Sequence, residues 1–343
     1  MEIRRVFLDD TQERMKLEKF LESEGIRLDK SLEYTVGIYE GEKLIATGSF
    51  YKNTLRCLAV SSDYQGLGVL NTVVSHLINE QYQRGYTDLY LYTKCNTANF
   101  FSYLGFYEVV KVDGLVTFME NKSDGIKKYV EALSHKKVEG ESIGAIVMNA
   151  NPFTLGHLHL IEQAAKENDV LHVFVVSEEA SVIPFGVRYE LIKRGTSHIK
   201  NVVFHKAGNY IISSATFPSY FIKDENNVVE AHAKLDLEIF KRYIVPTLGI
   251  NKRYVGEEPY CEVTKSYNKI MKEVLEESGI QCKVIPRLEQ EGKAISASLV
   301  RECIRNDELE KIKELVPRST YEYFKSDEAK LLINKIKINS GRH

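Results

Sequence analysis

The sequence predicts an α/β protein of two domains, the second of which contains a parallel sheet. Its 343 residues are enough for two domains of ordinary size. Two buried-strand runs, 143–148 and 170–176, flank a loop and a helical stretch. Strand, helix and strand at this spacing imply parallel strands joined by a right-handed crossover. A segment rich in lysine, glutamate, serine and glycine, 122–142, separates this part from the first domain.

The bulk composition excludes several classes of protein. Hydrophobic residues make up 43% and charged residues 27%, which is normal for a globular protein with two apolar cores. The 46 basic and 48 acidic residues nearly cancel, which argues against a protein that coats nucleic acid. No apolar run approaches the length of a membrane span, and the N-terminus lacks a signal-peptide pattern, so we expect a cytoplasmic protein without a membrane partner. Five scattered cysteines without Cys-x-x-Cys spacing indicate reduced thiols and no protein-bound metal.

The first domain, 1–125, is expected to be α+β. Its strand patterns are at 33–39, 44–51, 55–60, 89–93 and 115–119. A glycine-containing loop, 65–68, precedes an amphipathic helix that includes Val73 and Leu77. A linker at 126–142 follows, with a short helix at 126–133.

The second domain, 143–325, continues the alternation of strands and helices after 176. The expected elements are helices at 156–168, 235–248 and 263–278, strands at 253–256 and 281–285, and a helix that begins after Ser296. Alternation of this kind predicts a Rossmann-like parallel sheet. The polar, lysine-rich residues 326–343 are expected to form a loosely held tail.

The loop 149–157, Asn-Ala-Asn-Pro-Phe-Thr-Leu-Gly-His, has the pattern of a phosphate-binding site. It joins a buried strand to a helix, at the edge where parallel sheets bind ligands. Free N–H groups and the positive end of the helix dipole attract phosphate there. Gly156 permits close backbone approach, Thr154 supplies a hydroxyl, and His157 can donate an N–H to a phosphoryl oxygen. The other candidate ATP-binding residues of this loop are Asn149, Asn151 and Phe153.

A second motif, Ile-Ser-Ala-Ser followed by arginine, occurs at 295–301. Ser296 or Ser298 can cap the following helix, and Arg301 lies in or near its first turn. Together with the Thr-x-Gly-His loop, this pattern is the signature of the nucleotidyltransferase superfamily. Arg188 follows the second strand, where a triphosphate could pass, and the Val-Gly-Glu-Glu-Pro segment 255–259 follows a later strand, where an adenosine would lie.

Four stretches of the second domain resemble the citrate lyase ligase family. They are 148–165, 177–185, 256–268, and 286–288 leading to 294–298. The resemblance covers most of the second domain, and the first half resembles the leading domain of that family. It implies that ATP, acetate and the thiol form of citrate lyase give AMP, pyrophosphate and acetylated citrate lyase. The thiol belongs to a phosphoribosyl dephospho-coenzyme A arm on the acyl carrier subunit.

The implied mechanism requires no enzyme nucleophile. Acetate attacks the α-phosphorus of ATP, the thiol then attacks the mixed anhydride, and the protein positions the reactants and stabilises charge. We expect Mg²⁺ to bind with ATP. The resemblance assigns His157 and Thr154 to the α-phosphoryl transition state. It assigns Arg188, Ser296, Ser298 and Arg301 to the β- and γ-phosphates, with Gly256 and Glu258 near the nucleoside.

The loop of the first domain resembles the acyl-coenzyme A loop of the GNAT acetyltransferases. Gln65, Gly66 and Gly68 fit a loop that cradles pyrophosphate with backbone N–H groups, whereas Leu70 stands where glycine or alanine is usual. The segment 96–106 resembles a later motif of that fold, with Phe101 in the place of a common tyrosine and Tyr103 nearby. A coenzyme-arm site and a pure scaffold stay equally open, ahead of independent acetyltransferase activity.

Three other functions stay open at this point. One is an adenylyltransferase that joins AMP to a phosphorylated cofactor through the same loop. Another is an acetyl-coenzyme A-dependent acetyltransferase with a regulatory nucleotide domain. The third is a nonenzymatic subunit that docks to citrate lyase. Acetate-dependent release of pyrophosphate from ATP separates the ligase from all three.

Overall fold

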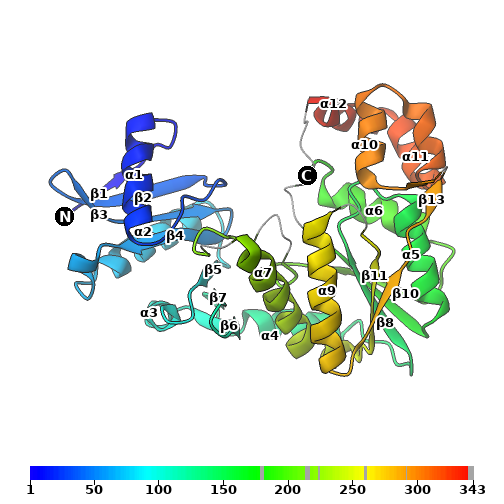
Figure 1. Cartoon of the computed structure of the whole chain (residues 1–343), viewed down its shortest axis with the longest axis horizontal. Helices are drawn as coiled ribbons and strands as arrows, with labels where there is room; N and C mark the ends of the chain where they lie inside the picture. The colour runs from blue at the N-terminus through cyan, green and yellow to red at the C-terminus, as the bar shows by residue number, and fades with distance from the viewer. Residues whose placement is uncertain (178–180, 213–216, 223–224, 259–260, 291, 339–343) are drawn as a thin grey trace. The chain divides into compact units, whose positions relative to one another are not determined.

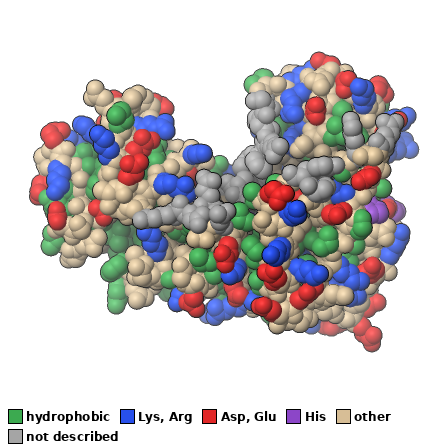
Figure 2. Space-filling view, viewed as in Figure 1, with side chains coloured by type: hydrophobic (Ala, Val, Ile, Leu, Met, Phe, Trp, Pro, Cys, Tyr) green, Lys and Arg blue, Asp and Glu red, His purple; other side chains and the backbone are tan. Residues whose placement is uncertain are grey.

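The structure is a computed structural model of the chain. It describes all residues except 178–180, 213–216, 223–224, 259–260, 291 and 339–343. The chain forms two compact units, one of residues 1–129 and 217–238 and the other of residues 130–216 and 239–343 (Figure 1). Among the described residues, none of the helices is long and apolar enough to cross a bilayer. Figure 2 shows acidic and basic side chains interspersed on the visible face of both units, in keeping with a net charge of −2.

The first unit is built on a seven-stranded sheet in the order β1-β2-β3-β4-β5-β7-β6. The strands are β1 (Glu2–Arg5), β2 (Tyr34–Glu40), β3 (Lys43–Tyr51), β4 (Thr54–Val60), β5 (Tyr90–Thr93), β6 (Tyr107–Val112) and β7 (Val116–Glu120). Neighbours are antiparallel except β4 and β5, which pair in parallel at Thr54–Leu55 and Tyr90–Leu91. A parallel pair needs a crossover, and α2 (Val69–Gln83) lies in that connection. The expected strands of this domain are confirmed.

Helix packing completes the core of the first unit. The other helices are α1 (Thr11–Ser23), the single-turn η1 (Ser62–Tyr64) and α3 (Ala98–Ser102). Val73 and Leu77 of α2 lie in one cluster with the sheet side chains Val36 and Leu91. Gly48 permits this approach, because a Cβ there would lie 2.5 Å from Cγ1 of Val73.

The segment 217–238, which contains most of α7 (Glu225–Ile239), packs within the first unit. The ring of Phe217 meets that of Tyr92 edge to face at 5.6 Å. The backbone N–H of Arg27 donates to the carbonyl of Tyr220 at 2.8 Å, and its guanidinium donates to two further carbonyls of the segment. This stretch lies inside the range that the sequence assigns to the second domain. Its buried aromatic side chains find their partners on the sheet of the first unit.

The second unit contains the predicted parallel sheet. Its five strands, in the order β10-β9-β8-β11-β12, are all parallel. They are β8 (Ile143–Met148), β9 (Val170–Val175), β10 (Val202–Lys206), β11 (Lys252–Gly256) and β12 (Gln281–Ile285). The direction of strand succession reverses between β8 and β11. In open parallel sheets such a switch point, at the carboxyl ends of the strands, is where ligands bind.

The helices of the second unit form two groups, those that pack on the two faces of the sheet and a C-terminal cluster. They are α4 (Gly125–Ser134, shared with the first unit), α5 (Leu155–Lys166), α6 (Phe185–Gly195), the π-helical turn η2 (Phe240–Ile244), α8 (Val245–Leu248), α9 (Glu262–Glu277), α10 (Ala297–Arg305), η3 (Leu309–Glu314), α11 (Arg318–Lys325), η4 (Asp327–Ala329) and α12 (Lys330–Ile338). A two-residue ribbon, β13 (Glu289–Gln290) and β14 (Lys293–Ala294), precedes α10. Ile161 of α5 and Leu191 of α6 pack on Val173 on one face, and Phe240 meets Phe174 on the other.

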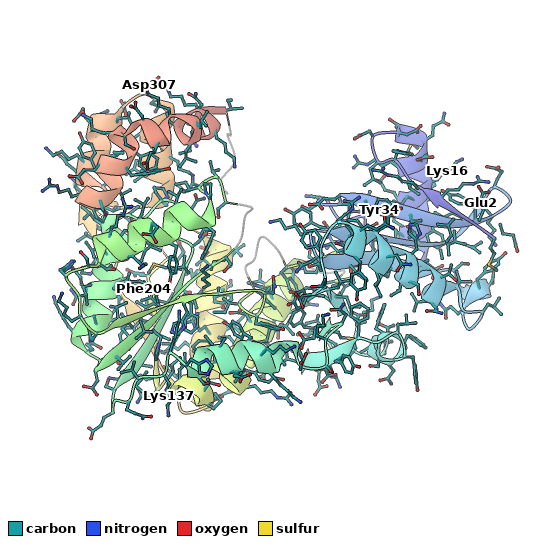
Figure 3. All side chains as sticks on the ribbon, turned by 180° about the vertical axis from the view of Figure 1, so that it is seen from behind. Glu2, Lys16, Tyr34, Lys137, Phe204 and Asp307 are labelled. Atoms are coloured by element: carbon teal, nitrogen blue, oxygen red, sulfur yellow. The ribbon has the colours of Figure 1, made fainter. Side chains whose placement is uncertain are left out.

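The C-terminal segment differs from the loosely held tail that the composition suggests. Residues 330–338 form α12, and its Leu332 and Ile336 are buried in a cluster with α10, η3 and α11. Lys337 also pairs with Asp307, the residue labelled at the turn after α10 in Figure 3. The reason is that Leu332 and Ile336, four residues apart, form an apolar stripe between lysines. Residues 339–343 lie outside the described chain.

Candidate functional site

The loop after β8 ends in a helix cap made by Thr154 and His157. The Thr154 hydroxyl accepts the backbone N–H of His157 at 3.3 Å, and the backbone N–H of Thr154 donates to Nδ1 of His157 at 3.1 Å. This is a reciprocal capping box with histidine in the place where glutamate or glutamine is usual. The imidazole is therefore fixed at the first turn of α5, and its ring stacks on the buried Phe153 ring at 6.1 Å.

These contacts decide the protonation of His157. Because Nδ1 accepts an N–H, the proton of the neutral ring is on Nε2, which is then a donor. Burial, and next the charge of Arg287, lower the pKa of His157 to about 4. The unfolded chain thus binds a proton between pH 6.5 and 4 that the folded chain does not. The contribution of His157 to the free energy of unfolding therefore falls as the pH is lowered through this window, and the ring stays neutral above it.

The other N–H groups at the start of α5 are mostly engaged. That of Leu155 donates to the carbonyl of Leu315 at 2.9 Å, and that of Leu158 to the carbonyl of Thr154 at 3.0 Å. For the N–H of Gly156, no acceptor occurs among the described residues. Two donors, the Gly156 N–H and the His157 Nε2–H, thus remain at this helix start.

Gly156 also brings the two sequence motifs together. A Cβ at this position would lie 3.1 Å from the carbonyl oxygen of Ile295, in the Ile-Ser-Ala-Ser motif. Ser296 caps α10, since its hydroxyl accepts the N–H of Leu299 at 3.1 Å, whereas the Ser298 side chain is in an exposed residue. The close contact at Gly156 in this structure is with Ile295, and approach of a phosphate to its backbone stays a prediction.

Arg188 is fully buried in α6 and holds the loop through its carbonyl groups. Its guanidinium donates to the carbonyl of Asn149 at 2.7 Å, of Val176 at 2.9 Å and of Ile183 at 3.0 Å. The exposed fraction of Arg188 is 0%, which leaves no surface for a phosphate. The placement favours a positioning role over the phosphate contact expected from the sequence.

Arg301 holds the same loop from α10. It is 4% exposed, donates to the carbonyl of Asn151, and contacts the hydroxyl of Ser298 at 3.3 Å. Two buried arginines therefore bind carbonyls two residues apart in the loop, at Asn149 and Asn151. They bring positive charge beside the loop 149–157, and each donates at least one N–H to its backbone.

The amide side chains of the loop anchor it to the segment before α6. The Asn149 amide exchanges hydrogen bonds with the hydroxyl of Ser181 at 2.9 and 3.1 Å. The Asn151 side-chain oxygen accepts the N–H of Ile183 at 3.1 Å. Residues 178–180, in the same family-like segment, lie outside the described residues. Asn149, Asn151 and Phe153 thus shape the loop in this structure.

Gly256 and Glu258 follow β11, the strand next to β8 in the sheet. A Cβ at Gly256 would meet no atom within 4 Å, so the backbone is open there. The Glu258 carboxylate pairs with Arg287 at 2.5 Å, and Nε of Arg287 donates to the carbonyl of Glu257 at 2.6 Å. Pro259 and Tyr260 of this segment lie outside the described residues. Glu258, expected near the nucleoside, is here the partner of an arginine.

Arg287 is a candidate that the sequence motifs do not identify. It lies just after β12, and the residue that follows it, Leu288, is linked to the loop through Ile295. The carbonyl of Leu288 accepts the N–H of Ile295 at 3.0 Å, and the carbonyl of Ile295 faces Gly156. The signal in the sequence was its position after the carboxyl end of the expected strand 281–285, at the edge where this fold binds ligands.

The GNAT-like loop lies in the first unit and is open. Gly66 and Gly68 have φ of +78° and +77°, and a Cβ at either would meet no atom within 4 Å. Gly68 precedes the first turn of α2, and the Gln65 amide donates to the carbonyl of Val60 at 3.4 Å. Phe101 is buried in the core, whereas Tyr103 is 88% exposed.

The sequence is similar to proteins named as ligases of citrate lyase. It is 38% identical to the [Citrate [pro-3S]-lyase] ligase of Escherichia coli (strain K12), over 94% of this chain and 93% of that protein. Identity to the protein of the same name from Klebsiella pneumoniae is 37%, over 92% and 94% of the two chains. Among solved structures, a putative nicotinate-nucleotide adenylyltransferase from Vibrio parahaemolyticus overlaps 58% of this chain and 96% of that chain, with a TM-score of 0.37 and 14% identity.

A family model described as the citrate lyase ligase C-terminal domain matches residues 143–324, which begin at β8 and end in α11. The matched range contains the loop 149–157, the Ile-Ser-Ala-Ser motif and Arg287. With the full-length similarity to the two ligases, this match gives the family of the whole chain. The chain belongs to the citrate lyase ligase family.

Proposed function

We propose that the protein is an AMP-forming acid–thiol ligase that acetylates the acyl carrier subunit of citrate lyase. The full-length similarity to the two [Citrate [pro-3S]-lyase] ligases supports the reaction class. The observation that carries the chemistry is the neutral His157, whose Nε2–H is a donor at the start of α5. A donor fixed before the reaction stabilises developing charge on a phosphoryl group without reorganising.

The reaction has two balanced steps. A carboxylate oxygen of acetate attacks the α-phosphorus of ATP, the bond to the bridging oxygen breaks, and pyrophosphate leaves with its electron pair. The sulfur of the phosphoribosyl dephospho-coenzyme A arm then attacks the acetyl carbon, the bond to the adenylate oxygen breaks, and AMP and a proton are released. Neither step needs a nucleophile from the protein, so positioning and charge stabilisation account for catalysis.

Each residue of the site has a proposed part. The Nε2–H of His157 and the N–H of Gly156 contact the α-phosphoryl oxygens, and Thr154 orients the imidazole. Ser296 and Ser298, at the start of α10, face the β- and γ-phosphates, with Mg²⁺ bound through the phosphate oxygens. Arg188 and Arg301 position the loop through its carbonyl groups. Asn149, Asn151 and Phe153 shape the loop. The nucleoside lies over Gly256, beside Glu258.

An adenylyltransferase is the less favoured alternative, because the full-length relatives carry the name of a ligase. We place the reaction in the cytoplasm. All five cysteines, each within the described residues, are free thiols, as a reducing compartment favours.

The test of the proposed function is isotope exchange between pyrophosphate and ATP. We expect exchange that requires acetate and magnesium but not the carrier subunit, because the adenylate forms in the first step. Adding the thiol form of the carrier should then yield AMP and the acetylated carrier. Transfer of AMP to a phosphorylated cofactor such as nicotinamide mononucleotide, without any need for acetate, would instead establish the adenylyltransferase.

The GNAT-like loop is proposed to hold the pyrophosphate of the carrier arm. Gly68→Val should then lower acetylation of the carrier roughly tenfold or more while acetate-dependent exchange stays unchanged, because a side chain blocks backbone approach to phosphate. Gly85→Val is the matched control, since Gly85 also has a positive φ, +85°, and open space around its Cβ. Equal carrier acetylation by the two variants would exclude this role of the loop and leave the first unit as a scaffold.

A further inference from the structure

The three arginines of the site differ in what their guanidinium groups can reach. Those of Arg188 and Arg301 are buried and bind loop carbonyls. The Arg287 side chain is 24% exposed. It uses Nε for the Glu257 carbonyl and Nη2 for the Glu258 carboxylate, and its Nη1 makes no hydrogen bond to a described residue. Arginine has five N–H donors, so part of the Arg287 fork is available to a ligand.

Two backbone contacts connect the residue after Arg287 with the start of α5. Arg287 follows β12, which pairs with β11, which pairs with β8, so the carboxyl ends of the three strands lie along one edge. The chain after Arg287 contacts Ile295, which contacts Gly156, the neighbour of His157. The charge of Arg287 contributes to the lowered pKa of His157, which agrees with a short distance between the two side chains.

Glu258 helps to hold the guanidinium of Arg287 in place. Its carboxylate is only 14% exposed on the side chain and fixes Nη2, while the Glu257 carbonyl fixes Nε. A carboxylate alone at this edge would repel a polyphosphate, and the ion pair removes that repulsion. The two fixed contacts also restrict the rotamer, so the remaining N–H groups lose less entropy when they meet an anion.

We propose that Arg287 contacts the phosphate chain of ATP beside His157, and that Glu258 is the positioning residue that holds its guanidinium there. This inference rests on the proposed ligase function and names a phosphate ligand within it. It moves the direct cationic contact from Arg188 and Arg301, which hold the loop, to an arginine just after β12, the strand two places away from β8 in the sheet.

The experiment measures acetate-dependent exchange and binding of a nonhydrolysable ATP analogue in the full-length protein. Arg287→Gln should lower kcat/KM for ATP roughly 10–100-fold and weaken analogue binding, while KM for acetate changes less than about twofold, because charge-assisted contacts to phosphate are lost. Arg287→Lys should recover part of the loss. Arg318→Gln is the control, since the Arg318 side chain is 90% exposed and its ion pair is with Glu322 on its own helix.

Glu258→Gln tests the positioning role. It should raise KM for ATP less than Arg287→Gln does, and the double variant should resemble Arg287→Gln alone, since both changes act on one contact. The inference is overturned if Arg287→Gln binds the analogue as the wild type does, or if its loss falls on acetate. Absence of acetate-dependent exchange in the wild type would instead remove the proposed function itself. If Arg287→Gln lowered the thermal stability but left analogue binding unchanged, Arg287 would stabilise the fold and would not contact ATP.

Discussion

His157→Ala should lower acetate-dependent turnover by about 10²–10³ with the fold intact, the usual loss when one preorganised donor to a developing oxyanion is removed. The reason is that Nε2–H is fixed by the capping box and has no replacement once the ring is gone. Steady-state exchange kinetics at saturating ATP and acetate measure the effect, and circular dichroism checks the fold.

Two comparisons make the His157 result specific. His198→Ala is the matched control, because His198 lies in the same unit, is 57% exposed on the side chain and pairs with the surface residue Glu162. It should keep full turnover. The wild-type rate should also show no His157 titration near pH 6.5, since the lowered pKa keeps the ring neutral and donating down to about pH 5. Near-normal turnover in a folded His157→Ala protein would remove the assignment.

Arg188→Met should lower the free energy of unfolding by about 3 kcal/mol or more. Methionine fills much of the volume but leaves three carbonyls, two of them in buried contacts, without this donor, and an unsatisfied buried carbonyl costs about 1–3 kcal/mol. Urea unfolding followed by far-ultraviolet circular dichroism measures this, since the chain has no tryptophan for fluorescence.

A direct phosphate contact by Arg188 predicts the opposite effects on stability and on KM for ATP. If its guanidinium met the β- or γ-phosphate, Arg188→Met would leave unfolding unchanged and raise KM for ATP. Arg318→Met, at an exposed position of the same unit, should alter the free energy of unfolding by less than about 0.5 kcal/mol. Partial recovery of stability by Arg188→Lys, with at most part of the three carbonyl contacts, would agree with the positioning role.

Features that depend on local pattern could be predicted from the amino-acid sequence alone. Alternation of buried strands and amphipathic helices gave the α/β class and the parallel sheet, and both are confirmed. The sequence placed the cap of the later helix at Ser296 or Ser298, and the structure selects Ser296, because a helix start depends on residues within three positions of it. Similarity over nearly the whole chain confirms the family that the loop and the Ile-Ser-Ala-Ser motif indicated.

Contacts between side chains that are distant in sequence could not be predicted in this way. Whether Arg188 binds phosphate or loop carbonyls depends on its burial, which a local pattern does not give. The pairing of Arg287 with Glu258 depends on β11 and β12 being neighbours in the sheet. The packing of 217–238 in the first unit likewise depends on partners far away in sequence. The physical reason is the same in each case: caps and periodicity act within a few residues, whereas burial and ion pairing depend on contacts between elements that only the folded chain brings together.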